Sequence, residues 1–354
     1  MKINLFQSNC YILYKKASAT IFKAAMLVLL FIPLISIGQK TLTEVFINDL
    51  KKFVFTYDEN YNTTAKKEYE KATVEDDWIL SDKETFSWLS NDKLMDKVVY
   101  RKGKAGNMLP EFRIIYNYNE NGKVFRKEMF YHREGHWQYD RDTEFHYTND
   151  QKLDSVFYYK KEGQQVFLSG LDTYDYDKNG RKVLFMSHDT KDDTYEPYPV
   201  KKTTFQYKNG KLHQKIKYYK ITWGDRKGQW EKNRKEEYVY GPEGKQRSNT
   251  QYRFKDESWL PATKTLRYTD SQGRKYKQLL KRHIDNQWQD YIKTEFSFMD
   301  VANKNEYIYP YLEQEEGENP FDIEGGIPAS ASRSLFKPKT GQWETKEKIR
   351  FIWE

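Results

Sequence analysis

The sequence is almost free of cysteine, and its mean hydropathy is low; both features restrict what the protein can be. Among 354 residues the one cysteine is Cys10, which lies in a leader-like segment at the N-terminus. Disulfide bonds, cysteine-ligated metals and thiol catalysis are therefore excluded for the rest of the chain. The mean hydropathy of −0.98 excludes a helical membrane protein with more than one span, because each span needs about 20 apolar residues.

Aliphatic side chains are also scarce, and aromatic side chains take their place. Leu, Ile, Val and Phe make up about a fifth of the chain, which is close to the composition of disordered proteins. The chain nevertheless contains 29 Tyr, 21 Phe and 9 Trp. Each aromatic ring buries a large area, so an aromatic core can replace an aliphatic one.

Residues 1–38 have the composition of a secretory signal peptide. They contain four lysines and no acidic residue, an apolar run that begins at Ala24, and small residues at Ser36 and Gly38. We predict cleavage after Gly38 and an exported protein that is periplasmic, at the outer surface or extracellular. The alternative is an uncleaved anchor, but an apolar run of about 14 residues is shorter than the ~20 that span a bilayer.

Removal of this leader leaves a chain of mixed charge. The remaining residues hold 56 Lys and Arg against 52 Asp and Glu. A net charge of +4 spread over 316 residues does not create the field that attracts a polyanion. We therefore predict no nucleic-acid partner, and no membrane span after signal cleavage.

A short phrase recurs about every 30 residues along the chain. It consists of an aromatic, any residue, an aromatic, a turn rich in Asp, Asn and Gly, and then Lys or Arg. Successive second aromatics are 28 to 33 residues apart across nine units. A repeat of this length indicates units that stack on their neighbours. The second aromatics are Tyr57, Trp88, Tyr118, Tyr147, Tyr176, Tyr207, Tyr240, Tyr268 and Phe298.

Another aromatic or Met residue lies nine or ten residues before most of these positions, and Trp343 likewise lies ten residues before Trp353. We call these residues the aromatic marks: Trp78, Met108, Trp137, Phe167, Tyr198, Trp230, Trp259, Trp288 and Trp343. Between the turns, residues alternate with a period of two, as in residues 211–219, which is typical of half-buried strands. We predict an all-β fold: an antiparallel β-hairpin repeat array of about 19 strands, forming an extended β-meander that is open, curled or propeller-like.

The turns support this prediction because their residues favour tight hairpins. Asn-Gly at 121–122, 179–180 and 209–210 supplies the positive φ angles that such turns need. We expect hairpin tips at 119–122, 177–180, 208–210 and 241–244. The segment 177–180 also suits a type I turn with a glycine bulge, so the strand register stays open.

Tyr176-Asp-Lys-Asn-Gly-Arg181, together with looser matches at 118–123 and 268–274, resembles a known repeat. It is similar to the YD repeats of RHS-like β-hairpin repeat proteins secreted by Gram-negative bacteria. The resemblance covers the turn of each unit across residues 55–304. It implies a secreted β-sheet scaffold and no particular reaction.

One segment breaks the rhythm and divides the chain. After Phe298 the next second aromatic is Trp353, and the residues between the two include an acidic tract rich in Pro and Gly. We predict a signal peptide at 1–38, a hairpin repeat domain of about nine units at 39–304, an insertion at 305–341 and a terminal repeat strand at 342–354. Long loops on a rigid scaffold often carry function, although this one could simply cover the end of the sheet. The candidate binding residues are Tyr307, Tyr309, Tyr311 and Phe321.

Catalytic and metal-binding motifs are missing from the sequence. His132 and His136 are four residues apart in a strand-rich region, with no third zinc ligand nearby. Asp175-x-Asp177-x-Asn179-Gly180 copies half of a calcium loop, but Met186 stands where a bidentate Glu is needed. Adjacent acids point to opposite faces of a strand and make poor catalytic pairs. We predict no metal, no cofactor and no enzymatic activity.

These observations favour a non-enzymatic secreted scaffold that binds a glycan or a protein at the cell surface or in the periplasm. Two alternatives stay open: a carbohydrate-active enzyme with its site near residues 305–330, and an outer-membrane β-barrel. Stacking of the repeats should align the second aromatics in a row, which we call the aromatic ladder. This ladder could stack on sugar rings if it is exposed. We expect it to form the core instead, because the chain has little else to bury.

Overall fold

A computed structural model describes residues 39–90, 93–191, 195–241, 244–299, 307–308 and 326–354. Residues Thr41–Glu354 form one compact unit. All regular elements of the described residues are strands, and none of these residues belongs to a helix long and apolar enough to cross a membrane. The predicted signal peptide lies outside the described residues.

Twenty-one strands follow one another along the chain, most of them 8 to 12 residues long. They are β1 (Lys40–Ile47), β2 (Lys51–Tyr57), β3 (Thr63–Glu70), β4 (Ile79–Ser90), β5 (Lys93–Lys102), β6 (Met108–Tyr118), β7 (Val124–Arg133), β8 (His136–Tyr147), β9 (Leu153–Glu162), β10 (Gln165–Tyr176), β11 (Lys182–Thr190), β12 (Pro197–Lys208), β13 (Lys211–Lys220), β14 (Trp230–Tyr240), β15 (Gln246–Lys255), β16 (Ser258–Thr269), β17 (Lys275–Ile284), β18 (Gln287–Phe298), β19 (Tyr307–Ile308), β20 (Pro328–Lys337) and β21 (Gln342–Trp353).

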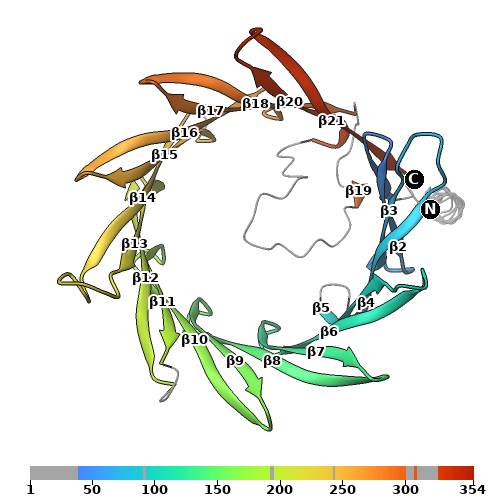
Figure 1. The fold of residues 1–354 in the computed structure, drawn as a ribbon, viewed down its shortest axis with the longest axis horizontal. Helices are drawn as coiled ribbons and strands as arrows, with labels where there is room; N and C mark the ends of the chain where they lie inside the picture. The colour runs from blue at the N-terminus through green and yellow to red at the C-terminus, as the bar shows by residue number, and fades with distance from the viewer. Residues whose placement is uncertain (1–38, 91–92, 192–194, 242–243, 300–306, 309–325) are drawn as a thin grey trace, which may run out of the picture. The chain divides into compact units, whose positions relative to one another are not determined.

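The strands form an antiparallel meander that closes into a barrel, which confirms the all-β prediction. Each strand from β1 to β18 pairs with the next, β18 pairs with β20, and β20 pairs with β21. The ring closes where β21 pairs with β1, with Val45 opposite Phe351 (Figure 1). The two-residue strand β19 also pairs with β1. Closure removes the open edges that an extended meander would expose.

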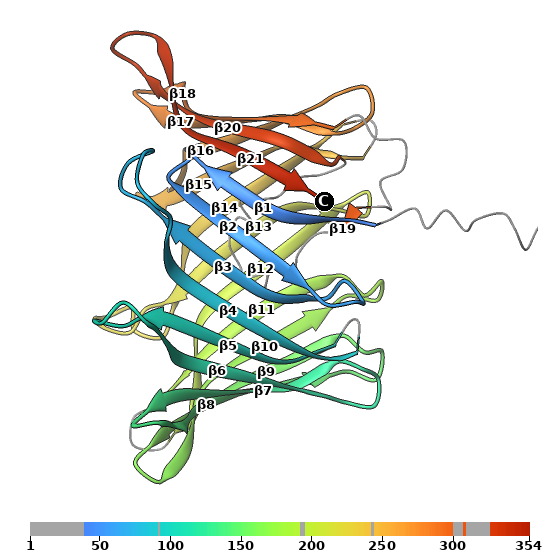
Figure 2. The same cartoon turned by 90° about the vertical axis from the view of Figure 1, so that its right-hand side faces the viewer.

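The two ends of the wall carry different connections, and we name them by their residues. The Asn-Gly rim carries the turns that follow β2, β4, β6 and the later even-numbered strands up to β16. The Trp rim carries the hairpins at the other strand ends (Figure 2). Each of the aromatic marks falls within two residues of the start of a strand that follows one of these hairpins. All strands are tilted in the same way between the two rims. Corresponding residues of successive repeats therefore form rows around the wall.

Turns of the Asn-Gly rim settle the register that the sequence left open. Asn119 Oδ1 accepts hydrogen bonds from the amides of Asn121 (3.0 Å) and Lys123 (2.9 Å), and Gly122 has φ +75°. This is a type I turn with a glycine bulge. The turn at Asp177 repeats it, whereas Asn209 and Gly210 both have positive φ and form a two-residue turn.

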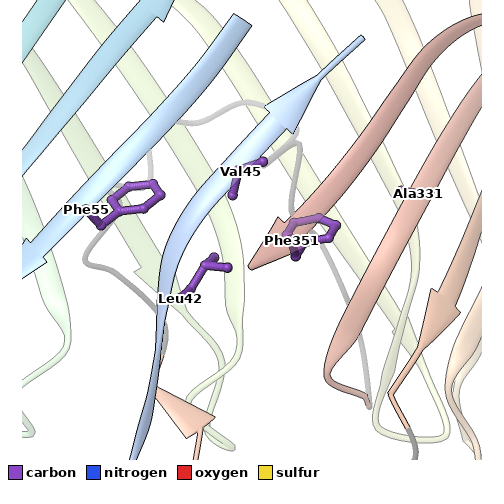
Figure 3. Packing of buried hydrophobic residues seen from close by; sticks show 5 residues of the cluster. All are labelled: Leu42, Val45, Phe55, Ala331 and Phe351. Carbon is purple, nitrogen blue, oxygen red and sulfur yellow. The ribbon is translucent and has the colours of Figure 1, made fainter. Parts of the chain in front are cut away.

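The aromatic pairs of the repeat share one side of the wall, which we call the aromatic face. Directly opposite residues lie on the same side of a sheet, and Phe55 faces Lys66 while Tyr116 faces Lys127. The best-buried cluster lies on this face at the closing seam, where Val45, Leu42 and Phe55 are 0 to 3% exposed (Figure 3). A second cluster surrounds Phe86. The aromatic ladder therefore contributes to the core, as expected.

One ladder position was predicted one residue away from its true place. Asp270 caps its turn as Asp177 does, so Thr269 occupies the position of Tyr176. Arg267 faces Gln278 on the aromatic face, while Tyr268 faces Lys277 on the other face. A slip of one residue moves a side chain across the sheet because the strand period is two.

The ring also continues through part of the expected insertion. Strand β20 lies within residues 305–341 and pairs with β18 and β21 along its length. Its small side chains, such as Ser330 and Ala331, leave no aromatic mark in the sequence, so the periodicity did not reveal it.

Candidate functional site

The structure describes none of the four predicted binding side chains. Tyr307 lies in β19, of which only the backbone path is described. Tyr309, Tyr311 and Phe321 lie outside the described residues. Their role stays a prediction.

The polar atoms of the ladder aromatics form hydrogen bonds to the backbone of the neighbouring strand. The hydroxyl groups of Tyr57 and Tyr118 donate to the carbonyls of Leu42 (2.7 Å) and Leu94 (2.8 Å), and Trp88 Nε1 donates to a carbonyl of β3. The same bond recurs at Tyr147, Tyr176, Tyr207 and Trp353. Burial raises the pKa of Tyr57. These rings are therefore anchored, which favours a structural role over stacking on a ligand.

Basic side chains from the turns cover several of these rings. Lys123 lies 4.9 Å from the ring centre of Tyr147, and Arg181 lies 4.8 Å from that of Tyr207. Each such cation–π contact is worth about 0.5–1 kcal/mol at an exposed site. The Lys or Arg that ends the repeat phrase thus has a packing role.

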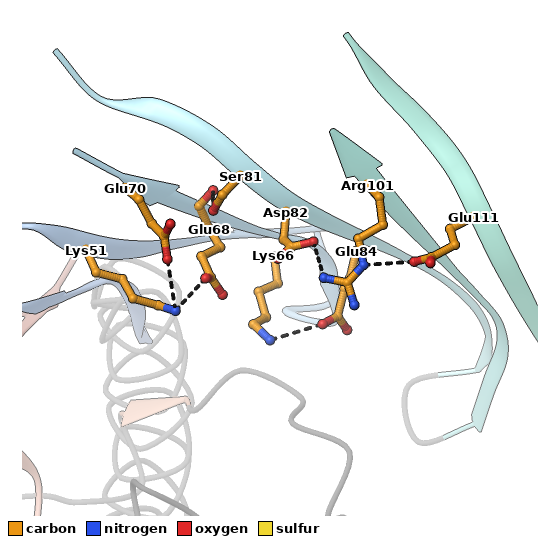
Figure 4. A network of polar contacts seen from close by, with 9 residues as sticks. All are labelled: Lys51, Lys66, Glu68, Glu70, Ser81, Asp82, Glu84, Arg101 and Glu111. Carbon is orange, nitrogen blue, oxygen red and sulfur yellow. Dashed lines mark hydrogen bonds and ion pairs between the residues drawn. The ribbon is translucent and has the colours of Figure 1, made fainter. Parts of the chain in front are cut away.

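A polar depression on the aromatic face of the described residues is a candidate site. It has a volume of about 190 Å³ and is built by three adjacent strands, β3, β4 and β5. The strand register places acids opposite bases: Lys66 faces Glu84, and Asp82 faces Arg101 (Figure 4). The lining residues are Lys66, Glu68, Asp82, Lys83, Glu84, Val99 and Arg101.

Glu84 is at the centre of this network. Its two carboxylate oxygens receive Lys66 Nζ (3.0 Å) and Lys97 Nζ (3.1 Å), one lysine each. Burial alone would raise the pKa of Glu84, but the two lysines outweigh it and hold the pKa below its usual value. The carboxylate is therefore ionised and fixed in direction.

The neighbouring charges are held in the same way. Arg101 donates to Asp82 (2.6 Å) and Glu111 (2.8 Å), and these bonds raise its pKa. Lys51 contacts Glu68 and lies 3.5 Å from Glu70. On this face Lys66, Lys97 and Arg101 balance Glu68, Asp82 and Glu84. The depression is thus neutral overall and presents hydrogen-bond donors and acceptors at fixed positions.

The chemistry of this site suits binding better than catalysis. A general acid needs a carboxyl group that keeps its proton near neutral pH. The lowered pKa of Glu84 instead keeps its carboxyl group ionised there. Within the described residues, no group of three or more His, Asp or Glu side chains could hold a metal ion.

We predict that the stabilising effect of Glu84 depends on pH. A carboxyl group whose pKa is lowered by folding stabilises the protein above its unfolded-state value, about 4.3, and loses this effect as the pH falls through the folded value. Glu84→Gln should therefore be less stable than the parent at pH 7, and the difference should shrink as the pH falls below about 4.3. Thermal melting of both proteins across the acidic range up to pH 7 tests this, and a difference that does not shrink on acidification would contradict it.

Sequence reasoning missed this site because its signal lies in pairs of strands. Lys66 and Glu84 are 18 residues apart, and only the strand register shows that they face each other. The alternation of charges within Lys66-Lys-Glu68 and Asp82-Lys-Glu84 is the one hint that the sequence offers.

No protein-family model matches the chain, and no curated protein matches it. A protein of unknown function from Bacteroides fragilis is 15% identical, with 34% of this chain and 89% of that chain covered and a TM-score of 0.29. A porin-like protein from Bacteroides uniformis is 10% identical, with coverages of 77% and 95% and a TM-score of 0.34. The TcdB2-TccC3 structure is 9% identical, with coverages of 87% and 16% and a TM-score of 0.30. Similarity at this level carries no argument about function, and the resemblance to RHS repeats stays a prediction.

Proposed function

We propose that the protein is an exported β-barrel scaffold that binds a neutral sugar unit of a glycan in the depression between β3 and β5. The observation that carries the proposal is the fixed, charge-balanced lining around Glu84 and Arg101. A sugar hydroxyl both donates and accepts hydrogen bonds, so it fits a surface where the two kinds of group alternate.

The size of the depression is consistent with this ligand. Typical small-molecule pockets have volumes of roughly 300–1,000 Å³, and this one has about 190 Å³. It therefore suits a single ring rather than a larger cofactor.

Binding of a glycan array to the mature protein tests the proposal. Glu84→Ala should weaken binding of the best glycan about tenfold, since a hydrogen bond to a charged group contributes roughly 1.5 kcal/mol and 1.4 kcal/mol is tenfold in affinity. The matched control is Glu237→Gln, which changes a carboxylate of lowered pKa on the other face. The proposal fails if no glycan binds, or if both variants lose affinity equally.

An outer-membrane barrel is the second candidate, and closure of the ring supports it. The strand lengths also match the 9–11 residues of membrane-spanning strands. A lipid-facing band needs one nearly uncharged side, however, and both faces carry charges in mid-strand: Glu84 and Lys97 on one face, and Arg126 and Asp142 on the other. We therefore favour the scaffold. Recovery of the native protein only in the outer-membrane fraction, with heat-modifiable migration, would reverse this preference.

A further inference from the structure

Positive charge is concentrated in one part of the wall. Residues 211–284, which contain β13 to β17, hold 20 Lys and Arg against 8 Asp and Glu. The net charge of +4 hides this concentration, because the other residues of the mature chain hold 36 Lys and Arg against 44 Asp and Glu. The basic segment lies well away from β3 to β5 along the ring (Figure 1).

Three cations form a row across neighbouring strands of the aromatic face. Lys217 on β13 faces Arg234 on β14, and Arg234 faces Arg253 on β15. Neighbouring strands are about 4.8 Å apart, and like charges directly opposite one another destabilise a sheet. Such a row therefore needs a compensating interaction.

The described residues provide little compensation. Lys217 lies 3.8 Å from Glu236. Arg234 and Arg253 are exposed, and neither side chain has a hydrogen bond or ion pair to any other residue that the structure describes. A matched pair elsewhere is different: Arg141 and Lys160 also face each other, yet Arg141 pairs with Asp140 (2.6 Å) and Lys160 with Glu162 (2.7 Å). The two arginines of the row lack acidic partners of this kind.

Next to the row, the repeat pattern gives way to neutral polar residues. Asn249 and Thr265 face each other, as do Gln251 and Thr263, all on the aromatic face. Arg267 stands where other units place an aromatic ring. Asn249 Oδ1 and Arg267 Nη1 are buried, and neither has a hydrogen-bond partner within the described part of the chain. A buried polar atom without a partner is energetically unfavourable, so this patch also lacks an interaction.

We propose that this cation row and the polar patch beside it bind an acidic oligosaccharide. Carboxylate or sulfate groups of the sugar pair with Arg234 and Arg253, whose planar guanidinium groups suit oxyanions. Sugar hydroxyls bind the amides and hydroxyls of Asn249, Gln251 and Thr263. A nucleic acid fits less well, because base stacking needs aromatic side chains and this patch presents amides and hydroxyls. The site is separate from the depression at Glu84 and does not depend on it.

The test is a titration of the mature protein with an oligogalacturonate, dextran sulfate, neutral dextran and single-stranded DNA. We expect the two anionic sugars to bind and neutral dextran not to bind. Arg234→Gln/Arg253→Gln should weaken binding at least tenfold, while the control Arg141→Gln/Lys160→Gln should change it less than twofold. The row variant should also melt at the same temperature as the parent or higher, because it removes repulsion between like charges.

The proposal fails if neither anionic sugar binds the parent, if the control variant loses as much affinity as the row variant, or if DNA binds more tightly than both sugars. A row variant that melts lower than the parent would mean that the arginines stabilise the wall and are not held for a ligand. Glu84→Ala should leave binding of the acidic sugar unchanged, so failure at one site is distinguishable from failure at the other.

Discussion

Replacement of Phe55 by Ala should lower the free energy of unfolding by about 3–5 kcal/mol, the usual cost of removing a buried aromatic ring. Phe55 is 3% exposed and packs with Leu42 and Val45 beside the seam that closes the barrel. Loss of the ring opens a cavity between β1 and β2. Chemical denaturation followed by tryptophan fluorescence measures the effect.

The control is Phe125→Ala, which removes the same ring from a position that is 42% exposed on β7. It should cost less than about 1 kcal/mol, as most surface substitutions do. Equal losses in the two variants would show that the seam cluster is no more important than the rest of the wall.

Arg126→Met should destabilise the protein by about 3–5 kcal/mol, because it leaves a buried carboxylate without its cation. Arg126 contacts Asp142, whose side chain is 4% exposed, on the face opposite the aromatic ladder. Burial, together with Asp142, raises the pKa of the neighbouring Tyr139 to about 12. Thermal melting at pH 7 measures the loss.

The double variant Arg126→Met/Asp142→Leu shows whether the unpaired carboxylate or the lost packing of the arginine causes the destabilisation. Replacement of both charges by apolar side chains is often neutral or stabilising, so the double variant should recover most of the loss. If it is as unstable as Arg126→Met, the damage comes from packing of the arginine stem and not from the unpaired carboxylate.

The strand pattern was predictable from the sequence because it rests on local chemistry. Alternation along 211–219 and turn residues such as Gly122 and Gly180 act within a few residues, and all of these features appear where they were expected. The Trp marks were also found beside the hairpins of one rim, where Trp259 packs against Phe254 at 5.0 Å. Trp259 is only half-buried, so its replacement should cost less than that of Phe55.

Closure and the candidate site were not predictable in the same way. Whether a meander closes depends on the contact of Val45 with Phe351, about 300 residues away, and no local signal reports this. The pairing of Lys66 with Glu84 depends on strand register, which a bulge of one residue changes. Tyr268 shows the same limit, since the spacing was right to within one residue and the face was wrong.

The seam between β1 and β21 has a consequence for the order in which the chain can fold. Most wall contacts join strands that are adjacent in sequence and can form as soon as both are present. The seam joins the first strand of the wall to the last, so it must wait until Gln342–Trp353 is available. Contacts of such high sequence separation form slowly, and until then β1 keeps an unpaired edge that can pair with another chain. A cell that makes this protein must therefore keep the nearly complete barrel apart from other copies during this final step.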